Sequence, residues 1–352
     1  MMIRLPGQLT GTSALLAALA VTGCAPIGQG NGGNDTGPDA GTTAKTCDKP
    51  LVKTMNLTLT GTDSIGNLPS SCWQLDGTLT INGTASSLAK LGDLRQVKDL
   101  VITGGSLTSI DMSEGLTVTR KLDIENSKLT SLANITLPDD SSCLTYLDSV
   151  TVMANPALTD LGGVAAMTCV SGAVKISNNV NLASIRLDKA QRLEGGVEIS
   201  YNNKLTQLTF ANVTSITGDL VVSNNAALTS FTSLANLKYM HGSVTIDSNP
   251  LLTTLPTQMQ TAPAPVIESS LTITNNPKLT ELGAFTKLSG VNLLINISNN
   301  SALDVCEAKA VGCCVYHPGT ATLHANNGTS CGVRPYCIAN TNNNCPYASV
   351  TN

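Results

Sequence analysis

The chain is poor in aromatic and charged residues. Phe, Trp and Tyr make up 3% of its 352 residues, and Asp, Glu, Lys and Arg make up 12%. A conventional globular enzyme core uses more aromatic side chains, so their scarcity argues against such a core. The hydrophobic share is nevertheless 41%, which is enough to bury a large core and argues against disorder. We therefore expect many thin layers of aliphatic residues.

Charge and histidine are also limited. The formal net charge is −4, so the chain lacks the basic surface that binds nucleic acid and is too weakly charged for a strongly acidic function. Its three histidines are His241, His317 and His324, and it contains no G-x-S-x-G, H-E-x-x-H or phosphate-binding glycine loop. We predict a protein that is not an enzyme and that uses no cofactor, no metal and no nucleic acid.

The first 24 residues have the order of a secretory signal that ends at a cysteine. Arg4 precedes the apolar run Ala14–Val21, which is too short to span a bilayer as a mature helix. The small residues before Cys24 resemble a bacterial lipobox, in which cleavage before the cysteine accompanies its lipidation. The resemblance implies that residues 1–23 are a lipoprotein signal peptide and that Cys24 holds the protein to a membrane. The alternative is an ordinary signal peptide with a coincidental cysteine.

The residues after Cys24 predict a tether and a location. Ala25 rather than Asp follows the cysteine, which by the sorting rule of Gram-negative lipoproteins implies the outer membrane or cell surface. Residues 25–46 are mostly Gly, Asn, Asp, Thr and Pro, so they can bury nothing. A flexible linker of this length spans about 25 Å. We therefore expect residues 24–46 to hold a folded domain clear of the lipid headgroups.

A repeat dominates the rest of the chain. Its clearest copy is LTITNNPKLTEL at Leu271–Leu282, and the position of Ile273 recurs in steps of 21 to 28 residues. The recurring positions are Leu59, Ile81, Ile102, Ile124, Val152, Ile176, Ile199, Val222, Ile246, Ile273 and Ile297. A period of this length is the signature of a solenoid, and each step predicts one coil. The two longest steps contain insertions, at residues 138–143 and 257–270.

Each position of the repeat has a predicted structural role. The alternation around the recurring Ile predicts a short strand with one face inward. A glycine four residues earlier, as in Gly195 and Gly218, predicts a tight turn. Three residues after the Ile stands an Asn that we expect to bond the backbone of the coil corner, forming a ladder. The ladder residues are Asn155, Asn179, Asn202, Asn225, Asn249, Asn276 and Asn300.

The pattern L-x-I-x-x-N-x-x-L-x-x-L with a preceding Gly resembles the receptor L domain, which is related in pattern to leucine-rich repeats. The resemblance covers roughly residues 50–305 and extends to bacterial and fungal cell-surface proteins built on this repeat. It implies a mainly β, right-handed parallel solenoid of about eleven coils over residues 47–305. It also implies a ligand-binding or adhesive module and not an enzyme.

Ten cysteines besides Cys24 predict disulfides, because an even number in an exported chain favours pairing. Cys47 and Cys72 bracket the first coil and are predicted to pair, and Cys143 and Cys169 could clip the first insertion. Six more form a predicted disulfide-rich C-terminal cap over residues 306–352: Cys306, Cys313, Cys314, Cys331, Cys337 and Cys345. Zinc binding with His317 and His324 is the competing interpretation, but the spacing lacks paired C-x2-C motifs.

The outward strand face is the predicted working surface. It is rich in hydroxyl side chains: Ser177, Ser200, Ser223, Thr245, Thr272, Thr274 and Ser298. Strand propensity alone would also place Thr there. Glu198, Lys175 and Asp123 lie on the same face, so a β-helix polysaccharide-degrading enzyme is an alternative. The insertion at residues 257–270 is a second candidate surface.

These observations predict a cell-envelope-anchored lipoprotein for binding or adhesion. Its membrane partner would be reached through the lipid on Cys24, and its β-solenoid surface would face an unknown protein or glycan. A purely structural envelope protein without a specific ligand is the alternative.

Overall fold

The computed structural model describes residues 49–61, 67–69, 71–259, 264–315, 320–324 and 326. The chain divides into two compact units, Met1–Thr46 and Cys47–Asn352. All described residues belong to the second unit. The predicted signal peptide, the lipidation site Cys24 and the linker therefore lie outside the described residues.

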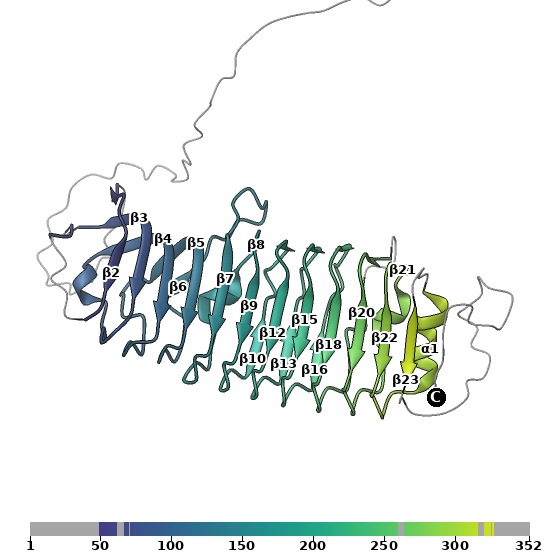
Figure 1. Ribbon diagram of the computed structural model, residues 1–352. Helices are drawn as coiled ribbons and strands as arrows, with labels where there is room; N and C mark the ends of the chain where they lie inside the picture. Colours follow the sequence, from purple (N-terminus) through teal and green to yellow (C-terminus); the bar gives the residue numbers. More distant parts are fainter. Residues whose placement is uncertain are drawn as a thin grey trace, which may run out of the picture. The chain divides into compact units, whose positions relative to one another are not determined.

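Most strands of this unit belong to one long parallel sheet (Figure 1). Its order is β1-β3-β4-β5-β7-β9-β12-β15-β18-β20-β22-β23, with β2 beside β3 and β6 beside β5. The strands are β1 Leu51–Lys53, β2 Leu57–Leu59, β3 Trp73–Ile81, β4 Leu94–Thr103, β5 Leu116–Glu125, β6 Ile135–Thr136, β7 Ser149–Met153, β9 Val174–Ser177, β12 Val197–Ser200, β15 Leu220–Ser223, β18 Val244–Asp247, β20 Leu271–Thr274, β22 Ile295–Ser298 and β23 Ala321–His324.

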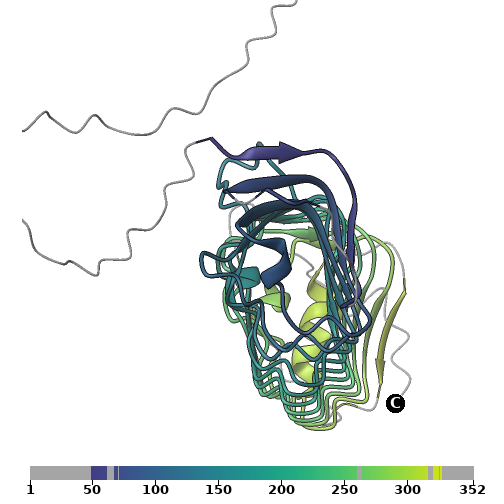
Figure 2. The same ribbon diagram turned by 90° about the vertical axis from the view of Figure 1, so that its left-hand side faces the viewer.

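Two further parallel sheets run beside the long sheet in the described part of the chain. The six-stranded one, called here the short sheet, has the order β21-β19-β17-β14-β11-β8, and a three-stranded one has the order β10-β13-β16. Their strands are β8 Cys169–Val170, β10 Ser184–Arg186, β11 Arg192–Leu193, β13 Gln207–Thr209, β14 Ser215–Ile216, β16 Ser230–Thr232, β17 Tyr239–Met240, β19 Val266–Ile267 and β21 Gly290–Val291. The three coils that begin with β9, β12 and β15 have one strand in each sheet, and successive coils superimpose when viewed along the stack (Figure 2).

This arrangement confirms the prediction of a mainly β parallel solenoid of about eleven coils. The strand register follows the repeat: Ile176 pairs with Ile199, and Ile199 with Val222. The recurring apolar side chains form one continuous core in which most are fully buried. Because a single coil cannot cover its own apolar edges, stacking supplies the burial that stabilises the fold.

Helical structure is minor in the described residues. Three 3-10 segments occur in coil connections: η1 Ala89–Leu91, η2 Gly162–Ala166 and η3 Gly283–Lys287. The α-helix α1 Val305–Cys314 starts at Asp304, whose carboxylate accepts a hydrogen bond from the Cys306 amide at 2.7 Å. It lies beside β23 and η3 and buries Ala308 and Val311 against the last coils. Within the described residues, no helix combines the length and apolar character that crossing a membrane requires.

The long sheet continues past residue 305, where the sequence predicted the solenoid to end. Strand β23 pairs with β22 in full register, Leu323 opposite Ile297. Leu323 occupies the recurring apolar position and is buried. The predicted C-terminal cap therefore contains a further strand of the sheet, and α1 replaces the connector of that coil.

The asparagine ladder runs through the coil corners. The backbone N–H of Asn202 donates to Oδ1 of Asn225 at 3.1 Å, and Nδ2 of Asn225 donates to the carbonyl of Ile199 at 3.0 Å. All seven predicted ladder residues make the equivalent contacts and are fully buried: Asn155, Asn179, Asn202, Asn225, Asn249, Asn276 and Asn300. Each amide therefore satisfies one donor and one acceptor of the preceding corner.

Two ladder members were missed from the sequence. Ser127 takes the first position, where its backbone N–H donates to Oδ1 of Asn155 at 2.9 Å. Asn326 takes the last, where its Nδ2 donates to the carbonyl of Ile297 at 2.8 Å. Asn326 stands three residues after Leu323, so the repeat spacing could have identified it.

The residue before Ser127 and before each of the seven predicted ladder Asn residues has a left-handed backbone. Its φ lies between 54° and 58° in eight successive coils. The residues are Asn126, Ala154, Asn178, Tyr201, Asn224, Ser248, Asn275 and Asn299. Asn tolerates this conformation better than other residues with a side chain. The recurring Asn pair therefore divides the work: the first Asn fits the backbone and the second forms the ladder.

Replacing Tyr201 by Asn is expected to stabilise the solenoid by about 1 kcal/mol, because Tyr at φ 55° carries a steric cost that Asn reduces. Its ring is 50% exposed, so little burial is lost. Urea unfolding followed by circular dichroism measures the change. The reverse substitution in the next coil, Asn224→Tyr, should destabilise by a similar amount. Equal stability of Tyr201→Asn and the wild type would contradict this explanation.

Candidate functional site

The outward face of the long sheet is less accessible than the sequence suggested. The predicted hydroxyl residues do lie in adjacent strands, and Ser177, Ser200 and Ser223 are in register. However, Ser177, Ser200, Thr274 and Ser298 are all buried. Two of their hydroxyl groups are also engaged in hydrogen bonds: Ser200 donates to Glu198 at 2.9 Å and Ser298 donates to Asn296 at 2.9 Å.

One row of accessible or partly accessible residues crosses this face. It runs through Lys175, Glu198, Val221, Thr245, Thr272 and Asn296, one residue from each of six neighbouring strands. Lys175 and Glu198 form an ion pair of 3.8 Å between Nζ and Oε2. Asp123 is paired with Lys121 at 3.1 Å. The three residues that suggested an enzyme are thus held in surface ion pairs.

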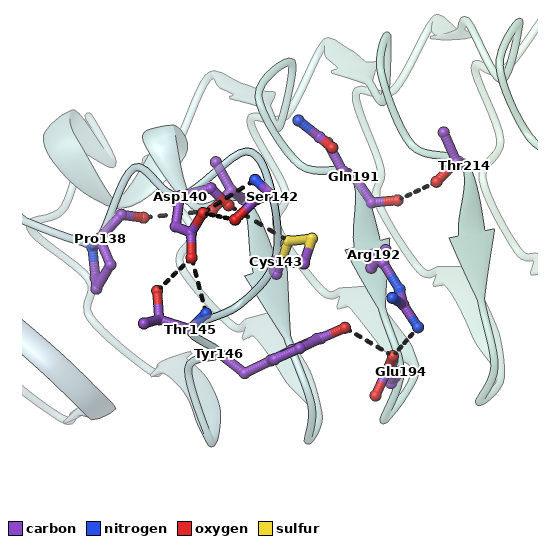
Figure 3. The surroundings of a disulfide bond; sticks show 12 residues. Pro138, Asp140, Ser142, Cys143, Thr145, Tyr146, Gln191, Arg192, Glu194 and Thr214 are labelled. Carbon is purple, nitrogen blue, oxygen red and sulfur yellow. Dashed lines mark hydrogen bonds and ion pairs between the residues drawn. A yellow bond between two sulfur atoms is a disulfide. The ribbon is translucent and has the colours of Figure 1, made fainter. Parts of the chain in front are cut away.

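The first insertion, Pro138–Tyr146, is a tightly held loop (Figure 3). Cys143 and Cys169 are joined by a disulfide, so the loop is clipped to β8 as the spacing suggested. The Asp140 carboxylate accepts bonds from the amides of Ser142 at 3.0 Å and Thr145 at 2.8 Å. Hydrogen bonds from the Ser142 side chain and the Thr145 amide lower the pKa of Asp140 to about 2.

The same loop is anchored at its start. Lys189 pairs with Asp139 at 2.8 Å, and the Thr168 hydroxyl donates to the Pro138 carbonyl at 3.3 Å. At the tip, Leu144 is 86% exposed. The loop therefore presents its outer residues in one conformation, which lowers the entropy that a binding partner must overcome.

At the end of the loop, Tyr146 meets the outer face of the short sheet. The phenol donates to Oε1 of Glu194 at 3.2 Å, and Nη2 of Arg192 donates to the same oxygen at 2.7 Å. The Arg192 guanidinium lies 5.7 Å from the centre of the Tyr146 ring, a cation–π distance (Figure 3). Burial, followed by the Glu194 charge, raises the pKa of Tyr146, so the phenol remains a neutral donor at pH 7.

A second cluster lies two strands further along the short sheet. Nδ1 of His241 is 2.7 Å from Oε2 of Glu268. The rings of Tyr239 and His241 are parallel to within 2°, with centroids 6.2 Å apart. Tyr239 is 58% exposed. Neither cluster was found from the sequence, because the short-sheet strands are two residues long and show no alternation.

The second insertion is partly structural. Residues 260–263 lie outside the described residues, but β19 at Val266–Ile267 belongs to the short sheet. Before the gap, Met259 is buried and bridges to Leu234. The described ends of this insertion thus complete one coil.

The remaining predicted cysteines are only partly described. Cys72 and Cys306 are each disulfide-bonded. The predicted partner of Cys72, Cys47, lies outside the described residues, as do Cys331, Cys337 and Cys345. Cys313 and Cys314 end helix α1. The zinc interpretation rested largely on His317 and the later cysteines, which are also outside; the described residues contain no group of three metal-binding side chains.

The fold defines the class of the protein: a stacked parallel β-solenoid. The family model of the receptor L domain matches residues 189–280. The matched segment includes four ladder residues, Asn202, Asn225, Asn249 and Asn276, and most of the short sheet. The chain therefore has a receptor L-domain-like fold, which favours a ligand-binding solenoid surface. No curated protein and no solved structure matches the chain significantly.

Proposed function

We propose that the protein is a lipid-anchored binding or adhesion protein of the cell envelope, located at the outer membrane or cell surface. The receptor L-domain match within a continuous solenoid carries the binding part of this proposal. The lipobox-like order of Ala14–Val21 and Cys24 supports the anchor. The partners would be a membrane, through the lipid, and a protein or glycan, through the solenoid surface.

The role proposed is binding and not catalysis. General acid–base chemistry needs carboxylates or bases placed around a reacting atom. On the long-sheet face, Glu198 and Asp123 are instead held in ion pairs with Lys175 and Lys121. A stable, regular surface with a pre-ordered loop suits an extended partner better than a small substrate.

Cys24→Ser tests the anchor. Wild-type cells grown with labelled palmitate should incorporate the label into this protein, and the Cys24→Ser protein should lose the label completely because no other residue takes its place. Thr22→Ser, which keeps a small residue in the same segment, should be labelled like the wild type. Label in Cys24→Ser, or its absence from the wild type, would refute lipidation at Cys24.

The binding role needs a separate measurement. The full chain carrying Cys24→Ser can be screened against purified envelope proteins and oligosaccharides. We expect saturable binding to at least one of them. A chain that binds none of these partners would favour a purely structural role, and cleavage of a polysaccharide would favour an enzyme.

A further inference from the structure

We propose that the outer face of the short sheet, between Tyr146 and Tyr239, binds a neutral β-linked glycan that runs along the stack of coils. This inference rests on the proposed binding function and names the site and the ligand class. Among the described residues, the exposed Tyr239 and the partly buried Tyr146 both lie on this face. Trp73, Phe210, Phe231 and Phe285 are by contrast buried in the core.

The residues of this face are aligned by the strand register. Arg192 pairs with Ser215, and Ser215 pairs with Tyr239. The residues that follow them, Leu193, Ile216 and Met240, are buried in the core, so Arg192 and Tyr239 point outward, and Ser215 is itself buried between them. Parallel strands lie about 4.8 Å apart, so β11 and β17 are about 10 Å apart with Ser215 between them. Two taller groups thus flank one short side chain.

The same three types of side chain occur at both ends of this span. At one end an aromatic ring, a basic side chain and a carboxylate come together as Tyr146, Arg192 and Glu194. At the other end the set is Tyr239, His241 and Glu268. Each ring offers a face on which the C–H groups of a pyranose can pack. Each ion pair offers fixed donors and acceptors for sugar hydroxyls, which both donate and accept.

Spacing and charge select the kind of glycan. An extended β-linked hexose unit has nearly the length of the strand spacing of about 4.8 Å, so one sugar can occupy each coil. Nη2 of Arg192 lies 2.7 Å from Oε1 of Glu194, and Nδ1 of His241 lies 2.7 Å from Oε2 of Glu268. Each basic side chain of these two clusters thus has a carboxylate partner, which favours an uncharged polymer over an acidic one. A protein partner fits less well, because protein interfaces deplete charged residues from their core.

The loop Pro138–Tyr146 completes the site. Its disulfide to Cys169 and the bonds to Asp140 fix Tyr146 before any ligand arrives. The loop is therefore already ordered before a glycan binds, and little binding free energy is lost in ordering it.

Titration calorimetry with hexasaccharides tests the proposal, using the full chain carrying Cys24→Ser. The probes are cellohexaose, which is neutral and β-linked, maltohexaose, which is neutral and α-linked, and β-linked hexamannuronate, which is acidic. We expect cellohexaose to bind with a Kd below about 1 mM and the other two at least tenfold more weakly. Absence of cellohexaose binding, or equal binding of hexamannuronate, would overturn the glycan assignment.

Matched tyrosine variants locate the site. Tyr239→Ala should weaken cellohexaose binding about tenfold, because one stacking face is lost. Tyr201→Ala is the control: it removes a ring of similar exposure, 50% against 58%, that lies at a coil corner away from the short sheet. Arg192→Gln should weaken binding without changing the unfolding midpoint.

The outcomes separate this inference from the proposed function. If Tyr239→Ala and Tyr201→Ala bind cellohexaose equally, the short-sheet site is wrong although the protein still binds a glycan. If no hexasaccharide binds but an envelope protein does, the assignment of a glycan ligand is wrong and the proposed binding function is retained.

Discussion

Asn225→Ala is expected to lower the free energy of unfolding by about 4 kcal/mol, because it leaves several buried polar groups without partners. Oδ1 of Asn225 accepts from the backbone N–H of Asn202 at 3.1 Å and from its Nδ2 at 3.4 Å. Nδ2 of Asn225 donates to the Ile199 carbonyl at 3.0 Å and to Oδ1 of Asn249 at 3.2 Å. Alanine supplies none of these bonds, and the site is fully buried.

Urea unfolding measures this loss, and Asn236→Ala is the matched control. Nδ2 of Asn236 also donates to a backbone carbonyl of an earlier coil, Ala211, at 2.9 Å, but this bond is exposed to solvent. Water can replace it, so we expect a cost of about 1 kcal/mol or less. If the two variants lose the same stability, burial of the ladder is not what makes it strong.

Gly218→Ala is expected to destabilise the solenoid by about 3 kcal/mol through backbone crowding. A Cβ at Gly218 would lie 2.5 Å from the nitrogen of Gly196 and 2.7 Å from the carbonyl carbon of Gly195. Both neighbours are main-chain atoms of the preceding coil, so no side chain can rotate away. The clash can be relieved only if the two coils move apart, which would lengthen the hydrogen bonds between β12 and β15.

Gly104→Ala is the control for this prediction. Gly104 has a positive φ of 67°, but a Cβ there meets no atom within 4 Å. Alanine at Gly104 therefore carries only the cost of a left-handed backbone, about 1 kcal/mol. Hydrogen exchange at β12 and β15 should increase in Gly218→Ala and remain unchanged in Gly104→Ala. Unchanged exchange and stability in Gly218→Ala would show that the coils are not in close contact there.

The role of these glycines shows where sequence reasoning stopped. The sequence predicted a tight turn at Gly195 and Gly218, but neither of them has a positive φ. Glycine is required because successive coils approach too closely for a Cβ. This close approach involves two coils, so the residue pattern of a single coil cannot predict it.

The fold itself was predictable because the solenoid repeats the same coil along its axis. Apolar positions repeat with the coil, so the strands, the core and the ladder follow from spacing alone. The sequence also showed that many ladder Asn residues are preceded by a second Asn. Only the backbone angles reveal that this preceding Asn takes the left-handed conformation. Asn326 was not predicted because it lies in the cysteine-rich segment that was interpreted as a cap and not as a further coil.

The candidate site could not be predicted in the same way. Tyr146 and Glu194 are 48 residues apart and belong to different parts of their coils, yet their side chains meet. The contact depends on an insertion that departs from the repeat and on the disulfide Cys143–Cys169, which holds this insertion against β8. The sequence predicted the clip between Cys143 and Cys169 but contained no signal for the direction in which Tyr146 points.

The ladder also gives the solenoid a direction of assembly. Each Asn completes the corner of the coil before it, as Asn225 does for the coil of Ile199 and Asn202. A corner therefore stays incomplete until the next coil, on its C-terminal side, is in place. A chain that is synthesised or exported from its N-terminus delivers coils in that order. The growing end of the fold always exposes one unfinished corner, and the arrival of each new coil closes it.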